Sequence, residues 1–179
     1  MTNDFVYDTQ ELLSDVLGPG SKVLDVGSGT GILCAAFYEM TKTGKAEPLV
    51  IGIEHIEHLA QSSYDNLCTS YREPLEAGCI KIVCGDGRQG YAPEAPYDAI
   101  HVGAGTQQIP EELLKQLKIG GKLVIPVGHP DDQYITLVTR TDESNFSTEQ
   151  TMCVRYVDLT SPEQQCPEMY QPPQQQIQY

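Results

Sequence analysis

A short apolar strand that runs into a glycine-rich turn constrains this chain more than any other stretch. Residues 23–31 read VLDVGSGTG, and apolar residues at helical spacing follow over 32–40. The strand suits a buried parallel sheet, and the glycines allow positive φ angles and leave room for a ligand beside the backbone. Amides at the start of a helix favour polar or partly charged ligand groups. The stretch therefore predicts a turn that cradles a nucleotide-like ligand.

Strand and helix patterns alternate along most of the chain, which is typical of a doubly wound, Rossmann-like α/β sheet. The apolar runs predict strands at 22–26, 49–53, 80–84, 97–102 and 121–127, and helices at 8–17, 30–42, 56–69 and 110–117. Pro110 suits the first turn of the last helix, and Gly120 and Gly121 suit its exit. Segments 133–140 and 151–157 alternate around a polar loop and predict an antiparallel strand pair at one edge of the mostly parallel sheet.

Length and composition predict one domain followed by a polar tail. A chain of 179 residues can form one sheet covered by helices on both faces. From Pro162 onward Pro, Gln and Glu dominate, and such a segment cannot bury enough apolar surface to order itself. We expect a single domain over 1–166 and a disordered Pro/Gln-rich tail over 167–179.

The net charge, the apolar runs and the cysteine pattern exclude several classes of binding partner. Eleven basic and 25 acidic residues give a formal net charge of −14, which repels a phosphate backbone. No apolar run approaches the roughly 20 residues of a membrane span, and the start carries no signal-peptide pattern. The six cysteines form no CxxC, so we expect reduced thiols and no metal site. We expect a cytosolic monomer that binds neither nucleic acid nor membrane.

Three acidic residues, Asp25, Glu54 and Asp86, lie at the carboxyl ends of the first three predicted strands, where ligands bind in such sheets. A carboxylate at Glu54 can accept hydrogen bonds from both ribose hydroxyls, and the turn at Asp86 can pair with adenine. Taken alone, such an acid is more often a helix cap, and an Asp-Gly pair is more often a plain turn. Together they suit a ligand with a cationic amino acid end, a ribose and a neutral base, and suit a pyrophosphate poorly. This ligand description fits S-adenosylmethionine.

Several strings of the chain resemble the protein-L-isoaspartate O-methyltransferase family. They are LDVGSGTGIL at 24–33, VIGIEHI at 50–56, GDGRQGY at 85–91, APYDAIHVGA at 95–104 and KQLKIGGKLVIPVG at 115–128. The string YVDLT at 156–160 is similar to the closing strand and turn of that family. The resemblance runs from about Glu11 to Gln165 and implies a class I S-adenosylmethionine-dependent methyltransferase fold.

The resemblance also implies a set of cofactor contacts. They are Asp25, Gly27, Ser28, Gly29, Glu54, His55, Asp86, Gly87, Thr160 and Gln165. Without it, Thr160 is typical of a cap before Ser161, and His55 of an ordinary first helical turn. His101, on a predicted strand, is typical of a satisfied interior histidine and not of a catalyst.

The implied reaction is methyl transfer from S-adenosylmethionine to the free carboxylate of L-isoaspartyl and D-aspartyl residues in damaged proteins. Its products are S-adenosylhomocysteine and a methyl ester that cyclises to a succinimide and reopens partly to normal aspartate, which initiates repair. No general base is needed, because the carboxylate is already ionised at neutral pH. The enzyme then has to supply alignment and a dry site.

The resemblance does not include the N-terminal segment of the family, which carries the Ser or Thr that holds the substrate carboxylate. This chain begins MTNDFVYD, and Thr2 lacks the residues that flank that hydroxyl, so we assign no catalytic residue and expect an N-terminally shortened member. Two functions stay open: an isoaspartyl methyltransferase, and a cofactor-binding relative or shortened isoform that transfers no methyl group. A third, a nicotinamide-dependent oxidoreductase, would need GxGxxG, whereas the turn reads GxGxG.

Overall fold

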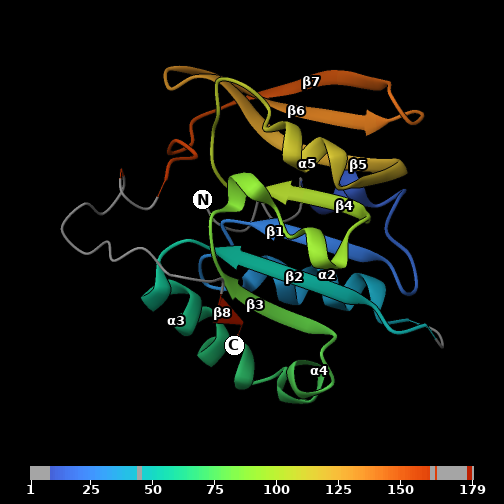
Figure 1. The fold of residues 1–179 in the computed structure, drawn as a ribbon, viewed down its shortest axis with the longest axis vertical. Coiled ribbons are helices and arrows are strands. Elements are labelled where there is room, and N and C mark those ends of the chain that lie inside the picture. The colour runs from blue at the N-terminus through green and yellow to red at the C-terminus, as the bar shows by residue number, and fades with distance from the viewer. Residues whose placement is uncertain (1–8, 44–45, 162–163, 165–176, 179) are drawn as a thin grey trace.

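The computed structural model describes residues 9–43, 46–161, 164 and 177–178, and its strands form one twisted sheet (Figure 1). The strands are β1 (Lys22–Val26), β2 (Leu49–Glu54), β3 (Ile80–Cys84), β4 (Tyr97–Val102), β5 (Leu117–His129), β6 (Asp132–Arg140), β7 (Phe146–Val154) and β8 (Ile177–Gln178). They lie in the order β7-β6-β5-β4-β1-β2-β3-β8. Strands β1 to β5 pair in parallel, whereas β6, β7 and β8 each pair antiparallel to a neighbour. The predicted α/β class and mostly parallel sheet are confirmed.

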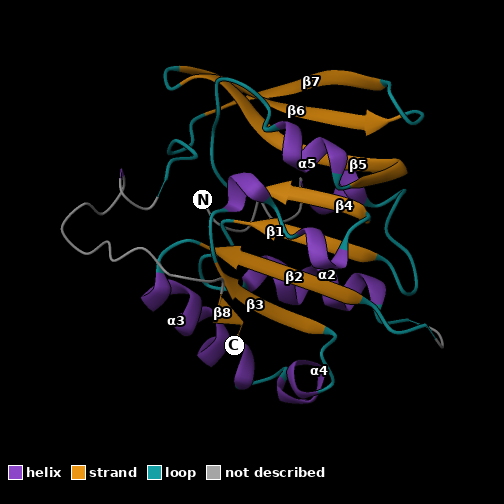
Figure 2. Ribbon diagram, viewed as in Figure 1, coloured by secondary structure: helices purple, strands orange, loops and turns teal. Residues whose placement is uncertain are grey.

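Helices cover both faces of this sheet, which gives three layers (Figure 2). The α-helices are α2 (Ile32–Thr41), α3 (Glu57–Cys68), α4 (Arg72–Glu76) and α5 (Glu111–Lys115), with 3-10 helices at Gly87–Gln89 and Ala92–Glu94 and a helical turn at 9–13. Phe37 of α2 and Leu67 of α3 belong to the apolar cluster on one face, and Leu113 of α5 belongs to the cluster on the other.

Strand β1 shows how the sequence fixes these two faces. Side chains alternate along a strand, so Val23 packs in the cluster under α2, whereas Leu24 and Val26 pack in the cluster under α5. Four of the five residues of β1 are buried, as expected for a central strand that is covered on both faces. The same alternation places Asp25 on the α2 face, where it matters for the site.

The predicted helix over 110–117 is shorter than expected, and the strand that follows begins earlier. Strand β5 already starts at Leu117, so Gly120 and Gly121 lie inside a strand and do not form a helix exit. Gly120 has a φ of +83°, and the pairing of β5 with β4 shifts register at this point. The two glycines therefore mark an irregularity in a strand, a role that glycine also plays in sheets.

The structure differs from the predicted helices at two further places. The sequence pattern does not predict helix α4, because its five residues are all exposed or half-buried and carry no apolar stripe. The N-terminal helix predicted over 8–17 is helical only over the described residues 9–13.

The C-terminal part contains the predicted antiparallel pair. Strands β6 and β7 pair over most of their length, with one irregularity between Tyr134 and Thr136. In the segment for which we predicted disorder, residues 177–178 form a short strand that pairs with Val83 and Cys84, and the rest lies outside the described residues. Within the described part of the chain, no helix is long and apolar enough to cross a bilayer.

Candidate functional site

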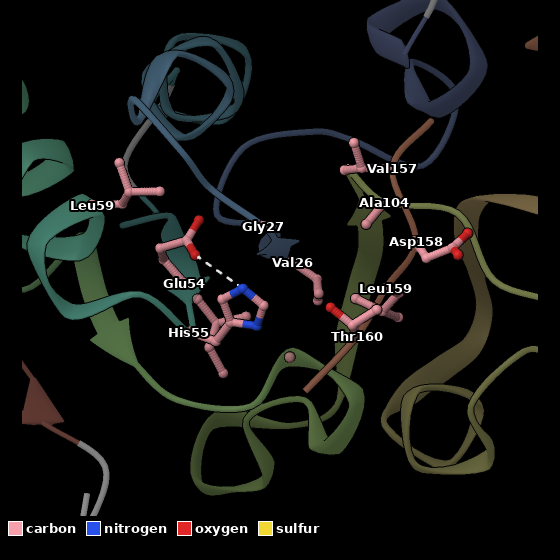
Figure 3. Close-up of a pocket in the computed structure, with 13 residues that line it drawn as sticks. Val26, Gly27, Glu54, His55, Leu59, Ala104, Val157, Asp158, Leu159 and Thr160 are labelled. Carbon is pink, nitrogen blue, oxygen red and sulfur yellow. Dashed lines mark ion pairs between the residues drawn. The ribbon is translucent and has the colours of Figure 1, made fainter. Parts of the chain in front are cut away.

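A pocket lies at the carboxyl ends of β1, β2 and β4 (Figure 3). Strand β1 has β2 on one side and β4 on the other, so this is the point where the strand order reverses. Ligands of open α/β sheets bind at such switch points. The pocket contains about 560 Å³ of empty space, part of it open to solvent.

The floor of the pocket is the glycine turn that follows β1. Gly27 has a φ of +78°, and the backbone amides of Gly27 and Ser28 both donate to the carbonyl of Ile53, at 2.8 and 3.1 Å. On the other side, the amide of Gly103 donates to the carbonyl of Val26 at 2.8 Å. The turn is therefore tied to β2 and β4, and Gly27 lines the pocket.

Glu54, at the end of β2, forms one side of the pocket. Its Oε2 accepts the amide of Gly29 at 3.3 Å, and its Oε1 accepts the amide of Ile56 at 3.1 Å, so the carboxylate joins the glycine turn to the start of α3. Nε2 of His55 lies 3.9 Å from Oε1 of Glu54, the contact drawn in Figure 3. Because a carboxylate has about four lone-pair sites, Glu54 can still accept hydrogen bonds from a ligand.

The facing side is a segment that we call the closing segment, residues 157–160. It is held against the loop after β4 by Gly105, whose amide donates to the carbonyl of Val157 at 2.7 Å and whose carbonyl accepts the amide of Leu159 at 2.6 Å. In Figure 3 the hydroxyl of Thr160 points toward the imidazole of His55 across the pocket, and the carboxylate of Asp158 points away from it. Thr160 and His55, both predicted cofactor contacts, therefore lie on opposite sides of the same cavity.

The pocket is acidic. Its lining includes the carboxylate of Glu54, and no lysine or arginine lies among the described lining residues. Such a site favours ligands with cationic groups and disfavours a pyrophosphate, which needs positive partners. The described residues include no cluster of His, Cys, Asp or Glu that could hold a metal ion.

Asp25 does not line the pocket, which corrects the expectation that three acids share its rim. Its side chain is about 1% exposed, with Oδ1 2.7 Å from Nδ1 of His101 and Oδ2 accepting the Cys34 thiol at 3.3 Å. Burial, followed by the charge of Asp25, raises the pKa of the Cys34 thiol well above its ordinary value. Asp25 points into the α2 face because strand alternation requires it, and His101 is the interior histidine that we expected.

Asp86 also lies outside the pocket lining, although the next residue, Gly87, belongs to it. The carboxylate accepts the backbone amide of Arg88 at 3.0 Å and pairs with its guanidinium, with Nη2 at 2.7 Å from Oδ2. Gly87 is required by a close approach, because a Cβ atom there would collide with the side chain of Val26. The backbone of this turn therefore lines the pocket at Gly87, while the Asp86 carboxylate caps the 3-10 helix Gly87–Gln89.

Two more predicted contacts could act only through their backbone. The side chain of Ser28 is buried toward the core, where a Cβ atom built on Gly52 would lie 3.0 Å from the Ser28 Cβ. Gly29 is near the pocket through its hydrogen bond to Glu54 but does not line it. Gln165 lies outside the described residues.

The sequence reasoning missed part of the lining. The missed residues are Val26, Ile53, Leu59, Gly103, Ala104, Val157, Asp158 and Leu159. Most of them are apolar strand ends or small residues, which carry no chemical signal of their own. The switch-point rule would have found Gly103 and Ala104, because they follow the strand next to β1.

The comparison with known protein families decides the assignment. The family model for protein-L-isoaspartate (D-aspartate) O-methyltransferase matches residues 5–164. The chain belongs to this family. A protein-L-isoaspartate O-methyltransferase 1 of Arabidopsis thaliana is 49% identical over 156 residues, covering 87% of this chain and 66% of the relative. A Caenorhabditis elegans member is 41% identical over 157 residues, covering 87% and 68%.

Solved structures agree with this assignment. A protein-L-isoaspartate O-methyltransferase of Plasmodium falciparum, in complex with S-adenosyl-L-homocysteine, superposes with a TM-score of 0.81 at 29% identity, covering 88% of this chain and 74% of that chain. A methyltransferase of Thiobacillus denitrificans, at 20% identity and a TM-score of 0.53, shares the fold. This chain spans about half to two thirds of the length of several curated family members it matches. The fold is that of class I S-adenosylmethionine-dependent methyltransferases, as the resemblance implied.

Proposed function

We propose that this chain binds S-adenosylmethionine in the pocket and transfers its methyl group to the free carboxylate of L-isoaspartyl and D-aspartyl residues in damaged proteins. The observation that carries the proposal is the acidic, glycine-floored pocket at the switch point of a chain that belongs to this family. The bound product in the Plasmodium structure supports the choice of cofactor. The absence of basic residues from the described lining weighs against a dinucleotide.

The residues present fit this cofactor. We assign Glu54 to the ribose hydroxyls, the backbone of Gly27 to the amino acid end, Gly87 to the base, and His55 and Thr160 to the two sides of the ligand. Four other predicted contacts contribute by shaping the turns around the ligand: Asp25, Ser28, Gly29 and Asp86. Gln165 stays a predicted contact. When bound, S-adenosylmethionine supplies an electrophilic methyl group on its sulfonium.

The chain itself has to align and desolvate the reacting groups. A substrate carboxylate is ionised at neutral pH, so no residue has to remove a proton from it. Apolar lining residues such as Ile53 and Leu59 exclude water, and the tied glycine turn holds a fixed geometry. Fixed alignment in a dry site is the contribution that raises the effective concentration of the two reactants.

The proposal also covers the setting in which the chain works. We propose a monomer in the cytosol whose partners are isoaspartyl-containing proteins, and not nucleic acid or membranes. The formal net charge of −14 supports the exclusion of nucleic acid, because it repels a phosphate backbone. Sedimentation of the purified chain, with and without DNA, tests both the monomer and this exclusion.

The test uses the whole chain, S-adenosylmethionine labelled in its methyl group, and two synthetic peptides that differ only in an isoaspartyl or an aspartyl residue. We expect base-labile methyl esters on the isoaspartyl peptide, read as volatile methanol, and background release from the aspartyl twin. Cofactor binding measured by calorimetry without methyl transfer would contradict the proposed activity and support the inactive alternative. Absence of both would contradict the cofactor assignment as well.

A further inference from the structure

Two buried glutamines hold two different walls of the pocket without lining it. Gln116, which follows α5, is 6% exposed, and Gln133 of β6 is 0% exposed. Each uses its side-chain oxygen to accept a backbone amide of a pocket loop, and each carboxamide packs against a glycine. Long polar side chains are seldom buried in this way unless their hydrogen bonds are needed.

Gln116 holds the turn that contains Gly87. Its Oε1 accepts the amide of Tyr91 at 2.8 Å, and its Nε2 donates to the carbonyl of Gln89 at 2.7 Å. Gly90 between them has a φ of +61°, and a Cβ atom there would collide with the Gln116 carboxamide. The Gln116 side chain therefore supplies hydrogen-bond partners for two backbone groups of this turn, the amide of Tyr91 and the carbonyl of Gln89.

Gln133 holds the closing segment in the same manner. Its Oε1 accepts the amide of Tyr156, the residue just before this segment, at 2.6 Å. Its Nε2 has no hydrogen-bond partner among the described residues and lies where a Cβ atom on Gly105 would be. Gly105 itself bonds to Val157 and Leu159, so Gln133 and Gly105 together hold the chain from Tyr156 to Leu159.

We infer that Gln116 and Gln133 are positioning residues for the cofactor pocket: Gln116 sets the Gly87 turn, and Gln133 sets the closing segment. The inference rests on the proposed function for the identity of the ligand, whereas the hydrogen bonds that hold the two loops do not depend on which ligand binds. Removing either side-chain oxygen leaves a backbone amide without its acceptor, so the local wall opens more readily. Each loop has its own glutamine, and no backbone–backbone hydrogen bond joins the described parts of the two loops.

The test measures amide hydrogen exchange and S-adenosylhomocysteine affinity for Gln116→Met and Gln133→Met, which keep side-chain volume and remove the carboxamide. Gln116→Asn and Gln133→Asn, in which the carboxamide is too short to reach, serve as second variants if a Met variant does not fold. Thr136→Val is the matched control, because Thr136 is buried on β6 and its hydroxyl contacts only the carbonyl of Tyr134 among the described residues.

We expect each variant to affect only its own loop. Gln133→Met should speed amide exchange over 156–160 and not over 86–91, whereas Gln116→Met should speed it over 86–91 and not over 156–160. Each variant should also weaken S-adenosylhomocysteine binding about three- to tenfold, the loss expected for one hydrogen bond. Thr136→Val leaves both segments and the affinity unchanged. Equal exchange in wild type and variants, or equal acceleration everywhere, would overturn the inference. If the wild type binds no S-adenosylhomocysteine, the proposed function fails, and the exchange pattern alone decides the positioning roles.

Discussion

The carboxylate of Asp25 lies 2.7 Å from Nδ1 of His101, and both side chains are about 1% exposed. The contact joins β1 to β4 directly before the two turns, at Gly27 and Gly103, that form the floor of the pocket. A buried carboxylate is tolerated only where other groups satisfy it, and here His101 and the Cys34 thiol do so. Asp25 therefore lies beneath the turns that form the pocket and does not line the pocket itself.

This relationship predicts energetic coupling between Asp25 and His101. We expect Asp25→Asn to lower the free energy of unfolding by about 1–3 kcal/mol, because one acceptor of a buried network becomes a donor. The double variant Asp25→Asn/His101→Gln should lose less than the sum of the single variants, with a coupling of about 0.5–3 kcal/mol. Urea unfolding of the four proteins measures this, and strictly additive losses would show that the pair is not coupled.

Glu54→Gln should weaken S-adenosylhomocysteine binding by about tenfold or more, because hydrogen bonds to a charged group contribute about 1.5–3 kcal/mol each. Calorimetry provides the affinity. Glu94→Gln is the control: it removes the same charge, but Glu94 pairs with Lys81 near the amino ends of the strands, away from the pocket. A similar loss in both variants would mean that net charge, and not the Glu54 contact, governs binding.

Gly87→Ala should destabilise the pocket wall by about 1–3 kcal/mol, the usual cost of forcing an atom into a packed site. The added methyl group would collide with Val26, so this turn has to shift and cofactor affinity should fall with stability. Gly18→Ala is the matched control, since no atom lies within 4 Å of the new methyl group and φ is not positive there. Thermal unfolding of the two variants checks this, and equal midpoints would argue against close packing at Gly87.

The strand and turn patterns predicted the sheet well because apolar spacing depends mainly on local burial. Glu54, His55, Gly87 and Thr160 all line one pocket, but for His55 and Thr160 only the family resemblance indicates a site role. The pattern of acids at strand ends places Asp25 at the rim, whereas its position on β1 puts it on the α2 face. The sequence also gave no sign that Asp86 pairs with Arg88. Such partners depend on which side chains the fold brings together, and a linear pattern does not contain that information.

Gly120 and Gly121 show a second limit of the pattern. Paired glycines after a helical run are typical of a helix end, and here they interrupt a strand instead. Tertiary pairing with β4 decides between the two conformations, because both are locally acceptable for glycine.

Because the Cys34 thiol is buried, we predict that the free energy of unfolding falls at alkaline pH. Its folded pKa is raised above the ordinary value of 9.0, so the neutral thiol stabilises the fold fully below about pH 9 and this contribution is lost as pH rises further. We expect wild type to lose up to about 1.4 kcal/mol more per pH unit above 9 than Cys34→Ala, measured by urea unfolding. Cys153→Ala, at an exposed cysteine, should keep the wild-type pH slope. Identical slopes in all three proteins would contradict burial of a neutral Cys34.

The most direct test of the account is a crystal structure of this chain with S-adenosylhomocysteine. We predict that the ligand lies in the pocket between Glu54 and Thr160, with the Glu54 carboxylate within hydrogen-bond distance of the ribose hydroxyls and Asp25 still bound to His101 beneath the glycine turn. A ligand bound elsewhere, or one in this pocket whose ribose does not contact Glu54, would contradict the assignment of the site.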